Sequence, residues 1–426
     1  MARYVVNTGA QQQEMLKEIG YDSFAELFEK AGVAKPLGRP LGIKEGMTEF
    51  EALAEMKELA GRNHVFKTVF RGAGSYRHYI PSVVKNIVSR NEFVTAYTPY
   101  QAEISQGVLQ SIFEYQTEIC ALTGMDVSNA SVYDGASAIA EAAEMCTERN
   151  RNTVILAGNI NPMYAATVKT YHQFGSLIIK ECGLDDLSVD DGTAAVVVQY
   201  PDYCGNIIDL KKIREQTAGT KLVVIADPIA LAVLESPGNL GADICVGEAQ
   251  QLGMPMSFGG PYLGFMACKE ALTRRLPGRI VGQTVDANGK RCYTLTLQAR
   301  EQHIRREKAS SSICSNEALC AFTAAVYLGA VGPQGLREVA LTGYQTAHYL
   351  QEKLQQLGFR KQNTGEFFSE FVTDSPVDTA KLEKHLMKHD ILCGLPLEDN
   401  RILWAATEVN TREEIDKLAE LIQEVL

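Results

Sequence analysis

Short apolar runs alternate with longer amphipathic segments from about residue 130 to residue 330. The runs are rich in Val, Ile and Leu, as is typical of strands that are buried on both faces. Their alternation with helical patterns predicts an α/β fold with a mainly parallel sheet that helices cover. Ligands of such sheets bind at the carboxyl ends of the strands. The predicted strands are Val154–Ala157, Leu177–Ile179, Ala195–Gln199, Leu222–Ala226, Ile244–Val246 and Leu263–Ala267.

The regions on either side of this pattern differ from it, so we expect three regions in the chain. Residues 1–95 show helical periodicity and predict a helical N-terminal region. Residues 96–334 form the large α/β domain. Residues 335–426 predict a smaller α+β domain, with strands at Phe367–Val372 and Ile402–Ala405.

The stretch from Tyr97 to Ala143 combines a polar and aromatic segment, a helix and a turn. Pro99 favours an extended conformation at its start, and Gly124 is a residue type that commonly ends helices. The sequence YDGAS at 133–137 then forms a turn before an alanine-rich helix. A helix N-terminus offers free N–H groups and the positive end of the helix dipole, so this turn is a candidate phosphate-binding site.

Composition and charge exclude several classes of partner. The chain has 426 residues, 46% of them hydrophobic, and a net charge of −11. Nucleic acid is not the expected partner, because phosphate backbones call for a basic surface. No apolar run suggests a membrane span, and the N-terminus MARYVVNTGAQQQ lacks the pattern of a secretory signal. We therefore expect a cytoplasmic protein without a membrane partner.

Neither the cysteines nor the histidines form an evident metal site. The ten cysteines are scattered and contain no C-x-x-C pair, so we expect reduced, mostly buried side chains. His385 and His389 are spaced one helical turn apart and could share a metal ion. No further ligand cluster accompanies them in the sequence, so we expect no metal site.

Several long sequence segments resemble the P-protein family of the glycine cleavage system. Within that family the resemblance is to the alpha subunit of the two-subunit form. The words are GAGSYRHYIPSVV, TPYQAEISQG, IFEYQTEICALTGMD, NASVYDGASA, FGGPYLGF and REQHIRREKASSSICSNEAL. The resemblance covers nearly the whole chain. The resemblance implies a fold-type I pyridoxal phosphate-dependent transferase-like fold. It also implies glycine decarboxylation with transfer of the aminomethyl group to the lipoyl arm of the H-protein.

A pyridoxal phosphate enzyme of this kind needs a phosphate site, an acid beside the pyridinium nitrogen and a lysine that forms a Schiff base. Asp134, Gly135 and Ser137 are candidates for the first requirement, and Asp227 for the second. Turn residues favour Asp and Gly for structural reasons as well, but we interpret these positions as a vestigial cofactor pocket. The lysine is missing, because residues 222–268 contain none.

The resemblance places Gln250 at the position of that lysine, five residues before Pro255. An amide cannot form a Schiff base, so we expect no catalytic residue in this chain alone. Pyridoxal phosphate would be bound by the partner beta subunit instead. Two alternatives stay open, a purely structural pseudoenzyme subunit and a self-sufficient pyridoxal phosphate enzyme.

Active sites of this fold lie between two chains, so this chain would contribute residues to the beta subunit's site. One candidate group is polar and lies at the start of a helix: Tyr97, Tyr100, Gln101, Glu103, Ser105 and Gln106. By resemblance, His78 and Tyr79 line a pocket, whereas a simpler interpretation makes their segment a tight turn beside packed aromatic residues. A third group, Arg300, His303, Arg305 and Arg306, adjoins a serine-rich turn that could bind an anion or a partner.

Overall fold

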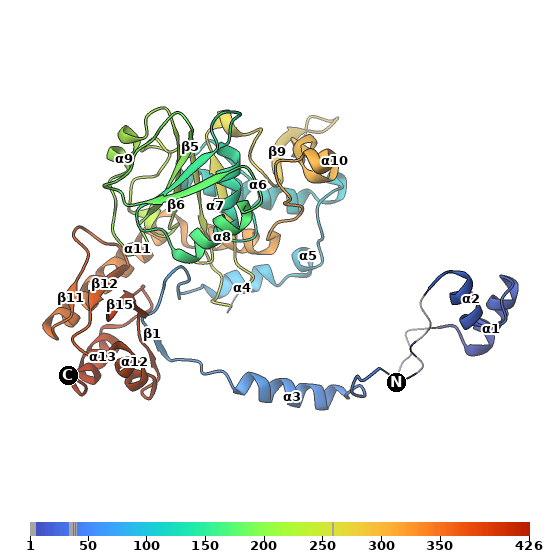
Figure 1. Ribbon diagram of the computed structural model, residues 1–426, viewed down its shortest axis with the longest axis horizontal. Coiled ribbons are helices and arrows are strands. Elements are labelled where there is room, and N and C mark those ends of the chain that lie inside the picture. Colours follow the sequence, from blue (N-terminus) through green and yellow to red (C-terminus); the bar gives the residue numbers. More distant parts are fainter. Residues whose placement is uncertain (1–5, 34–36, 38, 40, 258–259) are drawn as a thin grey trace. The chain divides into compact units, whose positions relative to one another are not determined.

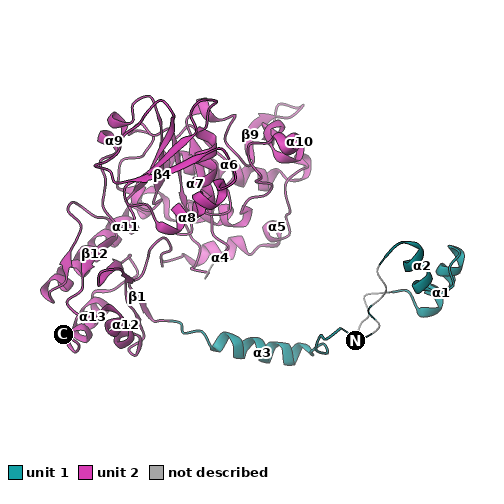
Figure 2. Cartoon of the chain, in the orientation of Figure 1, with its two compact units in different colours: residues 1–65 teal, residues 66–426 magenta. Residues whose placement is uncertain are grey.

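The structure is a computed structural model that describes residues 6–33, 37, 39, 41–257 and 260–426. The chain divides into two compact units, residues 1–65 and residues 66–426 (Figure 2). In its described part the first unit consists of α1 (Gly9–Glu18), α2 (Phe24–Lys30) and α3 (Glu49–Gly61). Thr48 and Glu51 cap α3 reciprocally, since each side chain accepts the other's backbone N–H. Part of the loop 35–42 and part of the word FGGPYLGF lie outside the described residues.

A seven-stranded sheet forms the centre of the second unit (Figure 1). Five neighbouring strands run parallel, and the other two, β8 and β2, pair antiparallel. All six predicted strands are present, so the mainly parallel α/β sheet is confirmed. In spatial order the strands are β2 (Val127–Ser128), β8 (Gly264–Cys268), β7 (Ile244–Glu248), β6 (Lys221–Ala226), β5 (Thr193–Tyr200), β3 (Thr153–Ala157) and β4 (Ile178–Cys182).

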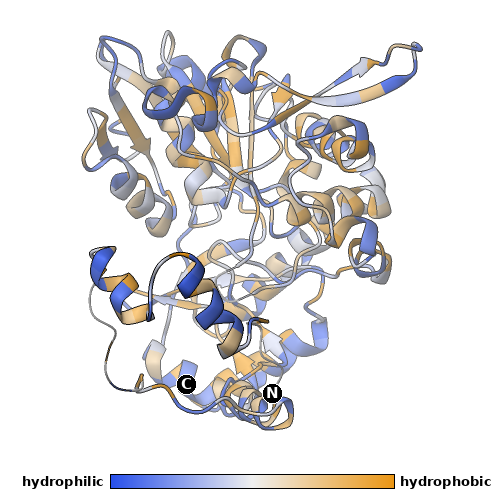
Figure 3. Cartoon of the chain, turned by 90° about the vertical axis from the view of Figure 1, so that its right-hand side faces the viewer, coloured by the Kyte–Doolittle hydropathy of each residue, from blue (hydrophilic) through white to orange (hydrophobic). Residues whose placement is uncertain are grey.

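Alternate residues of the central strands fill two different cores. Val196 and Val198 pack into one core with α6 and α11, whereas Val197 packs into the other with α7 and α8. Each such buried side chain contributes roughly 1.5–3 kcal/mol. Figure 3 shows the strands of this sheet as mostly hydrophobic. The surrounding helices are α4 (Ser82–Val88), α5 (Asn91–Val94), α6 (Gln106–Thr123), α7 (Gly135–Cys146), α8 (Pro162–His172), α9 (Leu210–Gln216), α10 (Gln302–Arg305) and α11 (Ala318–Gln356).

The long helix α11 is two helices joined at a kink. Gly332 has a left-handed φ of 62°, and Pro333 follows it. By length and composition alone, the helix Ala318–Gln356 is apolar enough to cross a membrane. Cys320, Ala324 and Tyr327 of its first half are nevertheless buried in the core of the sheet, which accounts for the apolar composition by packing.

The C-terminal part of the second unit forms a smaller α+β lobe, as expected. Its sheet has the order β11-β12-β15-β14, and a separate core surrounds Trp404. A hairpin of β9 (Ile280–Val285) and β10 (Arg291–Thr296) lies outside both sheets. The lobe's elements are β11 (Arg360–Lys361), β12 (Glu370–Asp374), α12 (Thr379–Met387), β13 (Ile391–Leu392), β14 (Leu395–Leu397), β15 (Arg401–Ala405) and α13 (Arg412–Gln423).

The unit boundary differs from the expected end of the N-terminal region at residue 95. Residues 66–95 belong to the second unit. Strand β1 (Thr68–Val69) pairs with β13 in parallel, and Phe70 is buried in the core of the small lobe. The pairing partners are more than 300 residues apart in the chain, so local periodicity could not reveal them.

Candidate functional site

The carboxyl ends of β6 and β7 bring together Asp227, Glu248 and Gln250, which are separated by short stretches of the sequence. Asp227 follows directly after β6, and Glu248 is the last residue of β7. Asp227 and Glu248 line a cavity of about 40 Å³ together with side chains from the small lobe, including Glu370, whereas Gln250 lies behind its wall. That volume has room for only a few water molecules. The expected site at the strand ends therefore exists as a small, strongly acidic cavity.

Glu248 holds the start of α7, the predicted phosphate-binding turn. Its Oε2 accepts the backbone N–H of Gly135 at 3.0 Å. Its Oε1 accepts the N–H groups of Gln250 and Leu263, both at 2.9 Å. A Cβ on Gly135 would lie only 2.9 Å from the backbone nitrogen of Glu248, so this close approach requires glycine. Burial raises the pKa of Glu248 to about 7, although the three N–H donors act in the opposite direction.

The other two residues of the turn cap α7. Asp134 Oδ1 accepts the N–H of Ser137 at 2.7 Å, and Ser137 Oγ accepts the N–H of Asp134 at 3.1 Å. This reciprocal arrangement satisfies donors at the helix N-terminus that would otherwise be free. In the expected phosphate turn, the N–H groups of Asp134, Gly135 and Ser137 are thus bonded to side chains of the same chain.

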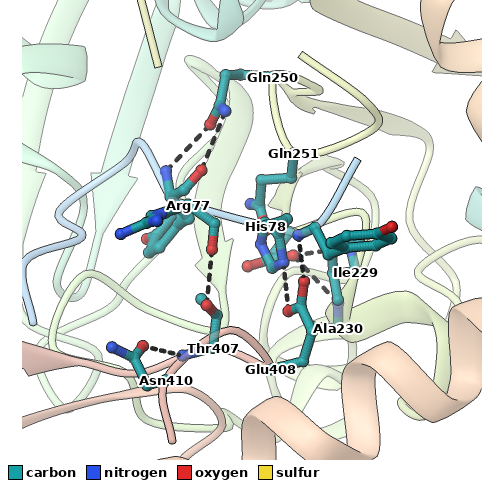
Figure 4. Close-up of polar contacts among 12 residues, drawn as sticks. Arg77, His78, Ile229, Ala230, Gln250, Gln251, Thr407, Glu408 and Asn410 are labelled. Carbon is teal, nitrogen blue, oxygen red and sulfur yellow. Dashed lines mark hydrogen bonds and ion pairs between the residues drawn. The ribbon is translucent and has the colours of Figure 1, made fainter. Parts of the chain in front are cut away.

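Gln250 is fully engaged by hydrogen bonds (Figure 4). Only 1% of the residue is exposed. Its Nε2 donates to the carbonyls of Tyr76 and Met254 at 3.0 and 2.7 Å, and its Oε1 accepts the N–H of Tyr76 at 3.0 Å. The amide therefore ties the segment around residue 76 to the end of β7, and it uses both donors and an acceptor to do so.

His78 contacts Gln251 and Glu408 through its two ring nitrogens (Figure 4). Its Nδ1 lies 2.7 Å from Glu408 Oε2, and its Nε2 lies 3.0 Å from Gln251 Oε1. Gln251 also bonds the Asp227 side chain. Burial alone lowers the pKa of His78, but the hydrogen bond and charge of Glu408 outweigh it, so the pKa is raised. The two ring contacts with acceptor oxygens fit a protonated imidazole.

His78 and its neighbour Tyr79 differ in burial. The His78 side chain is 7% exposed and faces the buried network, whereas Tyr79 is 66% exposed. Tyr76, which the sequence did not single out, is the residue of this segment that enters the cavity. Its hydroxyl donates to Glu370 Oε2 at 2.6 Å, and Glu370 Oε1 accepts the Ala73 N–H at 2.6 Å. Burial raises the pKa of Glu370 to about 7.

Tyr97, Tyr100, Glu103 and Ile104 form a second candidate region, which we call the aromatic surface. The exposed fractions are 86% for Tyr97, 62% for Tyr100 and 80% for Ile104. The buried guanidinium of Arg279 lies 5.7 Å from the Tyr100 ring centroid, within the range of a cation–π contact. Arg279 also donates to the Cys314 carbonyl at 2.9 Å and to Asn316 at 3.1 Å. This arginine therefore joins two of the sequence words that carry the resemblance.

The remaining members of the predicted group are placed differently. Gln101 is exposed beside the aromatic surface, and Ser105 is partly buried at the start of α6. Gln106 accepts the Tyr293 N–H and donates to the Tyr293 carbonyl, both at 2.9 Å. It therefore secures strand β10 to α6. In the arginine group, Arg300 donates to the Gly278 carbonyl at 2.7 Å.

Known proteins resemble the chain over its whole length. The sequence profile of the family described as "Glycine cleavage system P-protein" matches residues 2–422. The chain belongs to the P-protein family of the glycine cleavage system. A relative from Desulforamulus reducens, "Probable glycine dehydrogenase (decarboxylating) subunit 1", is 50% identical over an alignment of 438 positions that covers 98% of each chain. The relative of the same name from Thermotoga maritima is 45% identical over an alignment of 435 positions that covers 99% of each chain.

Solved structures give the same assignment. A crystal structure of glycine decarboxylase (P-protein) in inhibitor-bound form is 41% identical, with a TM-score of 0.92 and full coverage of both chains. The cystine C-S lyase C-DES is only 14% identical, with a TM-score of 0.61 over 85% of this chain and 98% of that one. Its likeness therefore concerns the fold alone. The fold-type I pyridoxal phosphate-dependent fold of the P-protein family is thereby confirmed.

The residues at the strand ends do not fit the cofactor of this fold family. A bound pyridoxal phosphate needs a pocket of a few hundred Å³, and the cavity here measures about 40 Å³. The phosphate would compete with the Glu248 carboxylate for the Gly135 N–H, and the two anions would repel each other. Gln250 offers an amide where the Schiff base needs an amine. The chain closes this pocket with its own side chains.

Proposed function

We propose that this chain is the subunit of an oxidoreductase P-protein that completes a glycine-decarboxylating active site housed in a second subunit. The observation that carries the proposal is that Glu248 already accepts the Gly135 N–H that a cofactor phosphate would need, while Gln250 beside it offers an amide bonded to Tyr76 instead of an amine. Glycine and the lipoylated H-protein are the proposed substrates of the assembled enzyme. Pyridoxal phosphate, bound by the beta subunit, would accept the electrons that decarboxylation releases.

The aromatic surface supports this division of roles. Large apolar rings that are exposed at one place on a chain commonly mark an interface, and Tyr is enriched at the centres of interfaces. Here two exposed tyrosines adjoin Glu103, and a buried arginine supports one of the rings. Such a surface can present hydroxyl and carboxylate groups to a site on another chain, and it can exclude water from that site. We propose the cytoplasm as the location of the assembly.

The test uses both purified subunits, separately and mixed, with pyridoxal phosphate, glycine and lipoylated H-protein. We expect no Schiff-base absorbance band and no carbon dioxide release from this chain alone. The band is expected with the beta subunit, and full activity is expected only with the mixture. Glycine-dependent carbon dioxide release by this chain alone would instead support a self-sufficient enzyme.

A purely structural subunit is the second candidate, because the buried network around His78 and Gln250 gives the chain stability without chemistry. It predicts that every loss of activity in a variant of the aromatic surface follows a loss of subunit association. The proposed function predicts variants that assemble normally and turn over slowly.

A further inference from the structure

His385, His389 and Glu424 come together at the edge of the small lobe, away from the strand-end cavity. His385 is in the last turn of α12, and His389 follows two residues after that helix. Glu424 is the residue that ends α13. One side-chain ligand atom from each residue lies within 4.8 Å of the other two. The sequence spacing reveals the two histidines only, because Glu424 is 35 residues further along.

The separation of His385 and Glu424 fits a shared metal ion. His385 Nε2 lies 3.4 Å from Glu424 Oε2. Two ligand atoms of a tetrahedral zinc ion are about 3.4 Å apart when the bonds are close to 2.1 Å. The His385 Nε2 atom is buried and has no hydrogen-bond partner among the described residues. A buried polar atom of this kind costs free energy unless something satisfies it.

The surrounding charges are mixed. The carbonyl ends of α12 and α13 both point toward this region, and helix C-termini favour cations. Lys384 and Lys388 lie on the same segment as the histidines and act against a cation. Because both lysine side chains are long, their ammonium groups can extend into solvent away from the ligands.

We propose that His385, His389 and Glu424 bind a divalent transition metal ion, with zinc as the best fit. Two imidazole nitrogens and a carboxylate oxygen are a zinc ligand set that leaves the fourth position to water. The ion would join the end of α12 to the end of α13 and so stabilise the small lobe. This proposal does not depend on the proposed function.

The test is a titration of the metal-free full chain with Zn²⁺, followed by calorimetry, with Co²⁺ as the visible-absorbance reporter of tetrahedral coordination. All proteins carry Cys314→Ser, because Cys314 is exposed and could bind the same ions. We expect one saturable site per chain and a melting temperature that rises with Zn²⁺ concentration. His385→Gln, His389→Gln and Glu424→Gln should each weaken binding by at least about tenfold.

Glu366→Gln is the matched control. Glu366 Oε1 lies 3.5 Å from His348 Nε2 in the same lobe, so this variant also breaks a His–Glu pair. No second histidine accompanies that pair in a metal-ligand cluster of the described residues. Zinc affinity should therefore be unchanged in Glu366→Gln. The proposal is overturned by the absence of saturable binding, or by affinities that do not distinguish the three ligand variants from this control.

Discussion

The strand-end cavity and the aromatic surface contain similar kinds of side chains in opposite situations. In the cavity, carboxylates, tyrosines and amides are buried and bonded to one another, as Glu370 is to Tyr76. On the aromatic surface, Tyr97 and Glu103 are exposed to solvent. Folds of this type bind ligands at the strand ends. In this chain the polar side chains at that position are instead hydrogen-bonded within the chain. We propose that the groups which act on another molecule are those of the aromatic surface.

The first prediction, with the largest expected effect, tests whether the cavity can regain a cofactor site. The variant Gln250→Lys supplies an amine at the position that the resemblance gives to the Schiff-base lysine. We expect carbon dioxide release by the variant alone to remain at least about a thousandfold below that of the assembled enzyme. A lysine at 250 loses the bonds to Tyr76 and Met254 and leaves Glu248 on the Gly135 N–H. The measurements are glycine decarboxylation and the absorbance band that borohydride removes. Turnover close to that of the assembled enzyme would show that the cavity can still hold the cofactor.

The second prediction concerns the hydrogen bonds through which Glu248 holds the start of α7. Glu248→Ala should lower the free energy of unfolding by about 3 kcal/mol or more, because it leaves three buried N–H groups without their acceptor. Urea unfolding followed by circular dichroism measures the change. Glu366→Ala, at an exposed glutamate, should cost less than about 0.5 kcal/mol. A small effect of Glu248→Ala would mean that the carboxylate is not needed to hold α7.

The sequence predicted the strands of the large sheet because their signal is local. The run Leu222–Ala226, for example, differs by one residue from β6 (Lys221–Ala226). It did not predict the hairpin of β9 and β10 or the pairing of β1 with β13. The sequence does contain a turn signal for this hairpin, Asp286-Ala287-Asn288-Gly289. The β1–β13 pairing depends on contacts that local patterns do not contain.

The candidate site was predictable to a smaller extent. The resemblance indicated Gln250, and the turn chemistry indicated Asp134 and Ser137. Glu248 was missed, although a lone acid at the end of a predicted apolar strand is a usable signal. Its role depends on an N–H group 113 positions earlier in the chain. Tyr76 and Glu370 meet only because the segment after β1 packs between the two lobes of the second unit.

The third prediction tests the aromatic surface. Tyr100→Phe and Glu103→Gln should lower glycine decarboxylation by the assembled enzyme by roughly tenfold to a thousandfold. Each removes one hydroxyl or one charge and preserves volume, so assembly should be unaffected. The control is Tyr171→Phe, at a tyrosine of α8 that is 49% exposed. Sedimentation of the mixed subunits accompanies the rates. Normal rates with normal assembly for both variants would remove Tyr100 and Glu103 from the site.

The last prediction, with the smallest expected effect, concerns the cavity. It states how the free energy of unfolding depends on pH. Burial raises the pKa of Glu370 from 4.5 to about 7. Between these two values the folded chain holds a proton that the unfolded chain has released. The free energy of unfolding should therefore fall as the pH rises from about 5 to about 7, by about 1 kcal/mol per pH unit for one such group.

Glu370→Gln isolates this contribution, because glutamine has the shape of the protonated acid and its carbonyl oxygen can still accept the Ala73 N–H. The variant should lose part of the slope between pH 5 and pH 7, while Glu248 keeps the remainder through its own raised pKa. Urea unfolding at several pH values, with Glu366→Gln as the exposed control, gives the slopes. Equal slopes in the wild type and Glu370→Gln would mean that this carboxyl group titrates alike in the folded and unfolded chains. The cavity would then be more hydrated than its closed hydrogen-bond network indicates.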